Sequence, residues 1–215
     1  TLTIFLPTIG AVGLMAFDKR AVEPMRVFSL VITAVTFGLS LLILQRFDAT
    51  DPAIQLSVAK PWISNWNVYY RLGVDGISLP LILLTSLISM LAMMASWSIT
   101  KAVRGYLMLF LLLETGMLGV FMALDFFLFY VFWEVMLLPM YFLIGIWGGP
   151  RREYAAIKFF LYTLLGGVLM LIAMLMFYFN SGSQFSLIAL ADMARDGGFF
   201  SQQMQITAFI LLFIG

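Results

Sequence analysis

The sequence contains no cysteine and no histidine, and charged residues make up only 11% of its 215 positions. Without thiols it holds no disulfide bond and no cysteine-ligated iron–sulfur cluster, and without imidazoles it holds no histidine-ligated haem. We therefore expect no iron–sulfur cluster, haem, flavin or metal on this chain. The net charge of +1 gives no electrostatic reason to expect a nucleic acid as a partner.

What the sequence has in abundance is apolar side chains. Hydrophobic residues account for 63% of the chain, whereas soluble domains contain about 45–50% apolar residues. A chain this apolar cannot cover itself with polar groups in water. Its apolar runs are continuous and do not alternate with polar residues, which favours helices over a β-barrel. The sequence thus predicts an all-α polytopic membrane protein.

A helix needs roughly 20 mostly apolar residues to cross a bilayer. On this basis we expect six transmembrane helices and the start of a seventh, at about 1–16, 27–45, 78–100, 106–123, 127–147, 156–179 and from 205 onward. We expect residues 1–105 to form an N-terminal part with the first three helices, and residues 106–215 to hold the others. Both ends of the sequence lie inside apolar runs, so we expect a fragment of a longer protein, and no cleavable signal peptide is visible.

Two of the loops are long enough to carry structure of their own. In the loop at 46–77, apolar and polar residues alternate on both sides of a short polar break, which predicts a β-hairpin on the outer face. The loop at 180–204 has apolar residues at helical spacing, which predicts a short amphipathic helix at the membrane interface: Phe185, Leu187, Ile188, Ala191 and Met193.

Four ionisable residues in or beside the apolar runs are candidates for proton translocation: Glu134, Lys158, Glu114 and Asp125. Ionisable groups at bilayer depth cost about 2.5–3.5 kcal/mol each on insertion scales, and they usually mark a pathway. Glu134 lies about eight residues into the fifth predicted helix, which places it roughly 10 Å or more below the membrane boundary. A carboxyl at this depth can take up or release a proton as a cation approaches or retreats.

Simpler interpretations exist for the other candidates. Asp125 precedes the fifth helix and is suited to cap it, Lys158 is near enough to the inner boundary to snorkel, and a neutral Glu114 can hydrogen-bond a neighbouring helix. Pro139 removes the helical partner of the Val135 carbonyl, which either holds a water molecule near Glu134 or only kinks the helix.

A proline and a glycine pair also bear on the predicted helices. Pro80 fits an ordinary first-turn proline. The Gly166-Gly167 pair allows the sixth helix to approach a neighbour closely.

Three motifs resemble one family of membrane proteins. They are L-G-V-D-G-I-S-L at 72–79, L-D-F-F-L-F-Y-V-F-W-E-V-M-L-L-P-M-Y-F-L-I-G-I-W-G-G at 124–149, and Y-A-A-I-K-F-F-L-Y-T at 154–163. Together they resemble chain 4, or subunit M, of proton-pumping NADH:quinone oxidoreductase (respiratory complex I). The residues that follow the glutamate in W-E-x-M-L-x-P-M-Y separate this family from its sibling subunits L and N.

The resemblance implies a fold of fourteen transmembrane helices with two inverted five-helix repeats, which is also similar to Mrp-type antiporter subunits. This chain then covers helices one to six and part of seven. The family's essential fifth-helix glutamate matches Glu134, and its sixth-helix lysine matches Lys158. Asp125 matches an acidic position before the fifth helix, and Glu114 matches a glutamate found in part of the family. The seventh-helix lysine, expected in an A-x-K-x-P context, lies just past Gly215.

The function implied is proton translocation coupled to quinone reduction elsewhere in the complex. The chain is then a non-redox subunit, with NADH, FMN, iron–sulfur clusters and quinone on other subunits. Its partners are neighbouring membrane subunits, and its location is a bacterial inner or mitochondrial inner membrane. Alternatives are a subunit of an Mrp-type Na⁺/H⁺ antiporter or of a related membrane-bound hydrogenase, and a structural scaffold whose charges have no role. We further expect Glu134 to face the protein interior and to lie near Lys158.

The first prediction concerns orientation and follows from the positive-inside rule. Seven Lys and Arg residues lie in the loops after the first, third and fifth helices, against four in the others. We therefore expect the loop with Arg151 and Arg152 to face the cytoplasm or matrix, and the 46–77 loop to face the opposite side. Cysteines introduced at Ser64 and Pro150 should react with an impermeant thiol reagent from opposite sides of sealed membranes. Labelling of both from one side contradicts this orientation.

Overall fold

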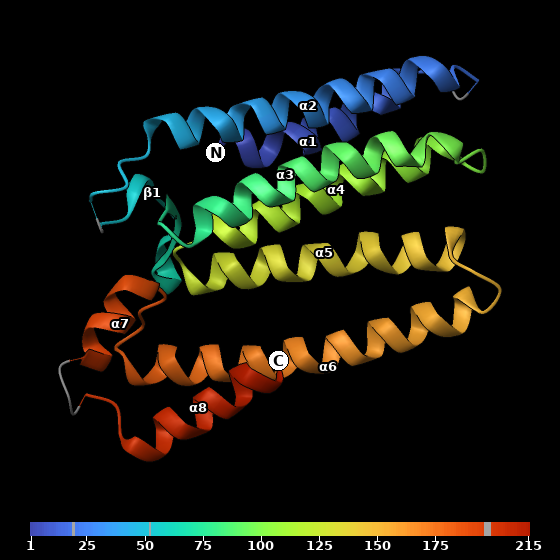
Figure 1. Cartoon of the computed structure of the whole chain (residues 1–215). Helices are drawn as coiled ribbons and strands as arrows, with labels where there is room; N and C mark the ends of the chain where they lie inside the picture. Colours follow the sequence, from blue (N-terminus) through green and yellow to red (C-terminus); the bar gives the residue numbers. More distant parts are fainter. Residues whose placement is uncertain (19, 52, 196–198) are drawn as a thin grey trace.

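A computed structural model describes residues 1–18, 20–51, 53–195 and 199–215. The described elements are helices joined by short connections, with one β-hairpin near the first third of the chain (Figure 1). They are α1 (Leu2–Gly13), α2 (Val22–Arg46), β1 (Gln55–Ile63), β2 (Val68–Val74), α3 (Ser78–Ala95), α4 (Val103–Met122), α5 (Phe126–Trp147), α6 (Arg152–Asn180), α7 (Leu187–Arg195) and α8 (Gln202–Ile214).

Five helices are long and apolar enough to cross a bilayer, so the chain is an integral membrane protein. They are α2, α3 with its 3-10 extension, α4, α5 and α6, with lengths of 20 to 29 residues. At 1.5 Å per residue the shortest reaches about 30 Å, the thickness of the hydrocarbon core. The predicted second to sixth spans are thereby confirmed. Two shorter apolar helices cover 2–16 and 202–214, where the first and seventh spans were expected.

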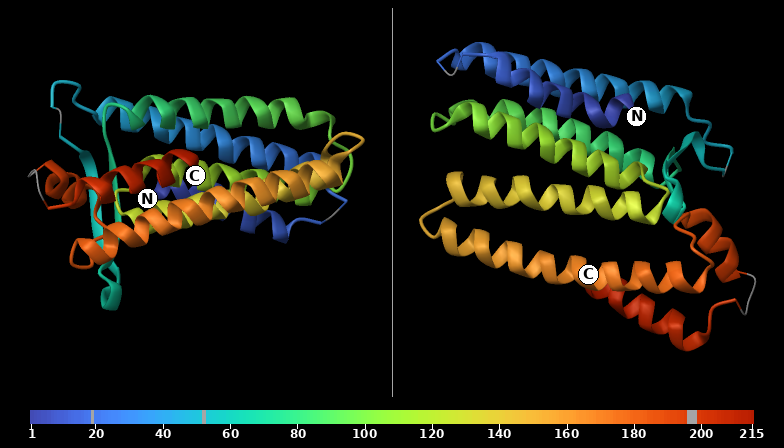
Figure 2. Two further views of the ribbon diagram at one scale, coloured as in Figure 1. Left: turned by 90° about the horizontal axis from the view of Figure 1, so that it is seen from below. Right: turned by 180° about the vertical axis from the view of Figure 1, so that it is seen from behind.

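The loops alternate between the two ends of the helix array, as the predicted topology requires. The α1–α2, α3–α4 and α5–α6 connections lie at one end, and the hairpin, the α4–α5 turn and α7 lie at the other (Figure 1). Lys19, one of the residues counted for the positive-inside rule, lies outside the described residues. Figure 2 shows α1 to α4 as one group of helices, with α5 and then α6 added on one side. In this array α4 packs against α1, α2, α3 and α5.

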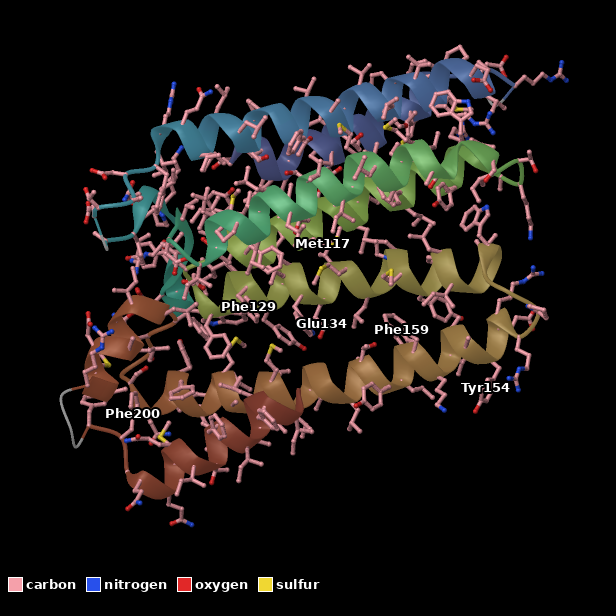
Figure 3. All side chains as sticks on the ribbon, in the orientation of Figure 1. Met117, Phe129, Glu134, Tyr154, Phe159 and Phe200 are labelled. Carbon is pink, nitrogen blue, oxygen red and sulfur yellow. The ribbon has the colours of Figure 1, made fainter. Side chains whose placement is uncertain are left out.

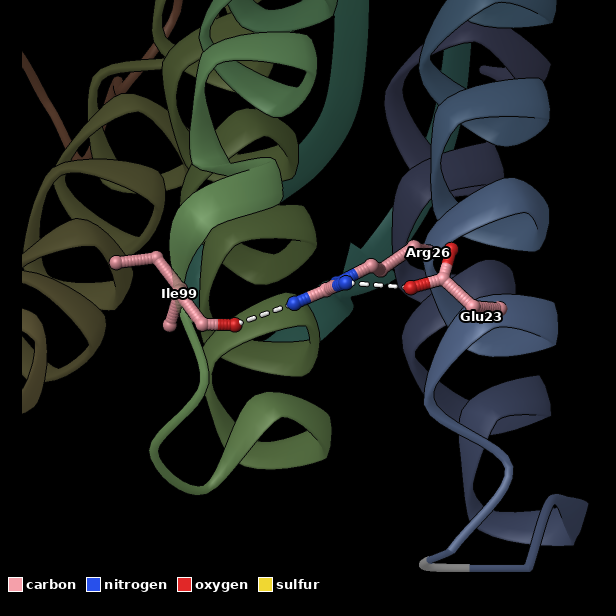
Figure 4. Close-up of polar contacts among 3 residues, drawn as sticks. All are labelled: Glu23, Arg26 and Ile99. Atoms are coloured by element: carbon pink, nitrogen blue, oxygen red, sulfur yellow. Dashed lines mark hydrogen bonds and ion pairs between the residues drawn. The ribbon is translucent and has the colours of Figure 1, made fainter.

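At the end that holds the α3–α4 connection, one arginine links this connection to α2. Arg26 donates from Nη1 to Glu23 Oε1 at 2.6 Å and from Nη2 to the Ile99 carbonyl at 2.7 Å (Figure 4). Its guanidinium also lies 5.8 Å from the centre of the Trp97 ring. The helix α2 begins at Val22, five residues before the predicted start of the apolar run.

Inside the α1–α4 group, buried polar residues accompany two apolar clusters. On α4, Leu111 belongs to one cluster and Leu118 to the other, with Glu114 between them. On α3, Ile82 and Met93 likewise belong to different clusters. The buried polar residues, which on α2 form a stripe along the helix, are Ser29, Thr33, Thr36, Ser40, Ser86, Ser89, Glu114 and Thr115.

The hydroxyl groups of these residues donate hydrogen bonds to backbone carbonyls and join neighbouring helices. Ser29 and Thr36 donate to carbonyls four residues earlier on α2, each at 2.9 Å, as is common for serine and threonine in helices. Ser40 and Ser86 share a hydrogen bond of 2.8 Å between α2 and α3, and Thr8 and Thr115 share one of 2.7 Å between α1 and α4. Such small polar residues allow close helix packing in a membrane.

The predicted β-hairpin is confirmed: β1 and β2 pair antiparallel, with Val58 opposite Leu72 and Lys60 opposite Tyr70. A helix in the second loop is confirmed, since α7 covers 187–195. Its buried residue is Leu190, whereas Ile188 and Ala191 of the predicted apolar face are exposed and Phe185 precedes the helix. Its place at the membrane interface stays a prediction.

These two loops meet at the α4–α5 turn. Leu124 donates its N–H to the Arg71 carbonyl of β2 at 2.9 Å and accepts from Leu187 N at 3.0 Å. The turn before α5 is therefore held from both sides. The expected division of the chain into 1–105 and 106–215 stays a prediction.

Glycines on α4 allow α5 to approach it closely. A Cβ added at Gly119 would overlap the ring of Phe132, and one at Gly116 would lie 2.5 Å from Met136 Cγ. Phe132 is itself buried, so its ring has little freedom to move aside. The α4–α5 distance therefore depends on these two glycines.

The second prediction tests this contact. Gly119→Ala should destabilise the protein by about 1–3 kcal/mol, because the added methyl group overpacks against the Phe132 ring. Gly105→Ala on the same helix is the control, since its Cβ would meet only Trp147 Cη2 at 3.9 Å; it should be neutral or stabilising by up to about 1 kcal/mol. Thermal unfolding in detergent measures both. Equal melting temperatures for the two variants contradict the prediction.

Candidate functional site

Glu134 lies on the α6 side of α5, about 12 Å along the helix from Phe126. Its Oε1 atom is buried and has no hydrogen-bond partner among the described residues. This oxygen lies against Gly167 of α6, and Figure 3 shows the side chain pointing from α5 toward α6. Glu134 was expected to face the protein interior, and the structure places one of its two carboxyl oxygens there.

The other side of Glu134 borders an apolar groove of about 510 Å³. Tyr130, one turn earlier on α5, lines the groove, and its hydroxyl lies near enough to the Glu134 carboxyl to interact with it. Pro139 also lines the groove, and α5 continues past it to Trp147. Since proline lacks an N–H, the Val135 carbonyl loses its helical partner one residue after Glu134. A carboxyl, a phenol and a free carbonyl are thus close together on α5.

The predicted proximity of Glu134 and Lys158 is wrong. The residue of α6 that lies against Glu134 is Gly167, nine residues after Lys158, and nine helical residues span about 13 Å. The Lys158 Nζ instead lies 5.9 Å from the centre of the Tyr154 ring, still farther from Gly167. Neither residue forms an ion pair with any part of the chain that the structure describes. Lys158 also lies on the opposite side of α6 from Gly167, because nine helical residues turn through about 180°, and it is exposed. The two residues therefore differ both in depth and in the side of α6 that they meet.

Lys158 is exposed on α6 and lines a hollow of about 570 Å³ beside the α5–α6 loop. Arg151 and Arg152 line the same hollow. Three positive charges therefore gather at this end of the helices. The structure is compatible with the snorkelling interpretation of Lys158 and does not test a role in proton movement.

Glu114 is fully buried, and within the described chain neither of its carboxyl oxygens has a hydrogen-bond partner. It lies on the stripe of α4 that includes Leu111 and Leu118, whose clusters contain residues of α2 and α3. The glycines that face α5 are about 140–200° away around the helix. Glu114 and Glu134 thus lie on different sides of α4, and the structure does not bring them together. Its predicted role in proton translocation stays a prediction.

Asp125 caps α5, as one of the two interpretations of the sequence predicted. Its Oδ1 accepts from the backbone N–H groups of Phe127 and Leu128 at 3.1 and 3.2 Å, and its Oδ2 accepts from Tyr69 N at 3.1 Å. Burial raises the pKa of this carboxyl, while the three N–H donors and the nearby Arg71 oppose the rise. Arg71 in turn donates to the Ser186 hydroxyl. Asp125 therefore joins α5 to the hairpin.

Sequence reasoning missed two neighbours of Glu134. Tyr130 was available from the four-residue spacing that places side chains on one face of a helix. Gly167 was noted only as half of a close-approach pair. The pair does approach neighbours, because Gly166 lies against the backbone of Gly215 while Gly167 lies against Glu134. Nothing in the sequence indicated that the two glycines face different partners.

Family models and individual relatives agree on one protein family for this chain. Residues 2–124 match the family model described as NADH-ubiquinone oxidoreductase chain 4, amino terminus, and residues 123–215 match the model described as NADH:quinone oxidoreductase/Mrp antiporter, TM. NADH-quinone oxidoreductase subunit M of Rhodobacter capsulatus is 44% identical over 184 residues, which cover 83% of this chain and 35% of that protein. This chain therefore spans about a third of the length of that relative.

Solved structures give the same result. A chain of respiratory complex I from Thermus thermophilus with bound NADH matches with a TM-score of 0.82 and 28% identity, over 99% of this chain and 42% of its own length. A chain of the Mrp complex from Dietzia sp. DQ12-45-1b matches with a TM-score of 0.78 and 24% identity, over 99% of this chain and 23% of its own length. The second match indicates a shared fold.

The third prediction separates the cap from the charge at Asp125. Asp125→Ala should destabilise the protein by about 2 kcal/mol or more, because α5 loses its cap and Tyr69 N loses its acceptor. Asp125→Asn should lose less stability, because its amide oxygen still caps Phe127 and Leu128, although its amide nitrogen cannot accept from Tyr69 N. Thermal unfolding in detergent measures both variants. Equal loss in the two variants contradicts the prediction that the cap contributes to the stability of this turn.

Proposed function

The chain belongs to the NADH:quinone oxidoreductase chain 4 (subunit M) family, and from this premise we propose that it is part of a proton-translocating, antiporter-like membrane subunit of respiratory complex I. In this role the subunit couples quinone reduction elsewhere in the complex to proton movement through buried ionisable residues. The chain spans 35% of the Rhodobacter relative, so the remaining helices of such a subunit contribute as well.

We propose the complete topology of the fragment as six transmembrane helices and the start of a seventh. On this view the shorter apolar helices at 2–16 and 202–214 also lie in the membrane, and the whole subunit has fourteen helices with two inverted five-helix repeats. The match over 99% of this chain to 42% of a complex I chain supports this proposal. The Lys and Arg bias places the Arg151–Arg152 loop on the cytoplasmic or matrix side of a bacterial or mitochondrial inner membrane.

The observation that carries the proposed function is the buried Oε1 atom of the Glu134 carboxyl. An oxygen that has no partner among the described residues is costly in a membrane-spanning helix. A proton on the carboxyl reduces that cost, and a cation that approaches from another helix reduces the cost of the ionised form. The two forms can therefore exchange as charge moves nearby. Tyr130 and the free Val135 carbonyl offer polar neighbours for the proton.

The other candidates have subordinate roles in this proposal. Lys158, with Arg151 and Arg152, gives the inner end of α5 and α6 a positive potential that favours the ionised form of acidic groups. Because Glu134 and Lys158 lie at different depths, groups from the rest of the subunit connect them. Glu114 and Asp125 stay candidates whose charge is tested by neutral substitutions.

We propose that the chain binds no redox cofactor, and that its partners are neighbouring membrane subunits of the complex. Electrons then pass through other subunits. An Mrp-type Na⁺/H⁺ antiporter subunit is the second candidate, because the Mrp complex has the same fold. A related membrane-bound hydrogenase is the third. Pumping that depends on quinone reduction and not on a sodium gradient separates the first from the second.

The fourth prediction is that Glu134→Gln lowers proton pumping by an order of magnitude or more while the complex still assembles. Glutamine keeps the size and hydrogen-bonding atoms of glutamate but cannot ionise. It is also less costly to insert in a membrane, so misfolding is a poor explanation for loss. Glu134→Asp should retain part of the activity, because aspartate still titrates but reaches one carbon less. Lys158→Ala should lower turnover to a smaller extent.

The measurement is NADH-driven quinone reduction and pH-gradient formation in sealed membrane vesicles. Native gels of the same membranes report assembly. Full pumping by the Glu134→Gln variant would leave this carboxyl as a structural group and would remove the basis of the proposed function.

A further inference from the structure

Two glycines at the α5–α6 interface, Gly145 and Gly167, differ in whether an added methyl group would fit. A Cβ added at Gly145 of α5 would lie 3.5 Å from Ala156 Cβ of α6, an ordinary van der Waals distance. A Cβ added at Gly167 of α6 would overlap Glu134 Oε1. The α5–α6 interface therefore has room for a methyl group at one depth and none at the depth of the carboxyl.

The cause of the tight contact at Gly167 is the carboxyl and not close approach of two backbones. Only Glu134 atoms, Oε1 and Cδ, lie within 4 Å of the added Cβ. At Gly116, where α4 meets α5, the added Cβ would instead lie near backbone atoms of Phe132 and Met136. The missing side chain at Gly167 thus makes space for the Glu134 carboxyl itself.

The position of Glu134 Oε1 depends on this space because few other contacts hold the oxygen in place. No described residue donates a hydrogen bond to Oε1, and the opposite side of the side chain borders the groove lined by Leu112, Val131 and Leu138. A carboxyl pushed away from α6 would therefore turn farther into this groove, toward Tyr130 and the apolar side chains around it. A glycine within a helix makes the helix less stable than an alanine would. The position that Gly167 allows for the Glu134 carboxyl offsets this loss of stability.

We propose that Gly167 is a positioning residue for proton transfer: the bare backbone of α6 at this point holds the Glu134 carboxyl against α6 and away from the apolar groove. This inference rests on the proposed function of Glu134. Gly167 touches neither the transferred proton nor a substrate, and it acts through the location of Oε1. A methyl group at 167 should displace the carboxyl without changing the number of charges in the membrane.

The experiment is a double-mutant cycle in the assembled complex. Gly167→Ala should lower proton pumping several-fold and shift the pH profile of pumping, because the titrating carboxyl leaves the surface of α6 and its surroundings change. Gly145→Ala adds the same methyl group to the same interface and should match the wild type. In the Glu134→Asp background, where the carboxyl is one carbon shorter, Gly167→Ala should have little further effect. Pumping, quinone reduction and assembly are measured for all five proteins.

Three results would overturn the inference. They are a pH profile for Gly167→Ala that matches Gly145→Ala, equal fold-losses from Gly167→Ala in the glutamate and aspartate backgrounds, and a loss of assembly that Glu134→Asp does not relieve. If Gly167→Ala alone fails to assemble, restored assembly in the double variant supports the steric contact. The Glu134→Gln variant tests the proposed function separately. Full pumping by that variant contradicts the proposed function, whereas additive effects in the double-mutant cycle contradict only the role of Gly167.

Discussion

A carboxyl group within a bilayer has no bulk water to satisfy it, so the protein itself must supply its surroundings. This constraint organises the interior of α4, α5 and α6. Glu114 is fully buried, and one oxygen of Glu134 is buried against Gly167. On α4, Glu114 lies between Leu111 and Leu118, which belong to two different apolar clusters. Small residues on α6 leave room for the Glu134 oxygen at that point.

The central helix α4 keeps the two carboxyls apart. One stripe of α4 holds Glu114 between Leu111 and Leu118 and faces the clusters shared with α2 and α3. The other stripe has Gly116 and Gly119, which bring α5 close. A helix with 3.6 residues per turn can present these two surfaces to different neighbours. Glu114 and Glu134 therefore lie in separate parts of the helix array, on different sides of α4.

The two ends of α5 are held differently, and this matters for a helix that carries an ionisable group. At its start, Asp125 caps the helix and accepts from Tyr69 N of the hairpin, while α7 and its preceding segment pair with the same turn. Farther along, Pro139 removes one backbone hydrogen bond. Glu134 lies between the anchored turn and the weakened one.

The sequence by itself determined the class of protein, the five long spans, the hairpin and the presence of helix α7, and it offered the cap at Asp125 as one of two interpretations. These follow from local properties: the length of apolar runs, alternation, and the preference of aspartate for helix starts. It also singled out Glu134, because a charge in such a run is rare. Only the tertiary structure decided what lies beside each charge. Glu134 meets Gly167 and not Lys158, because the depth at which two helices meet depends on packing across the whole interface and not on their order in the chain.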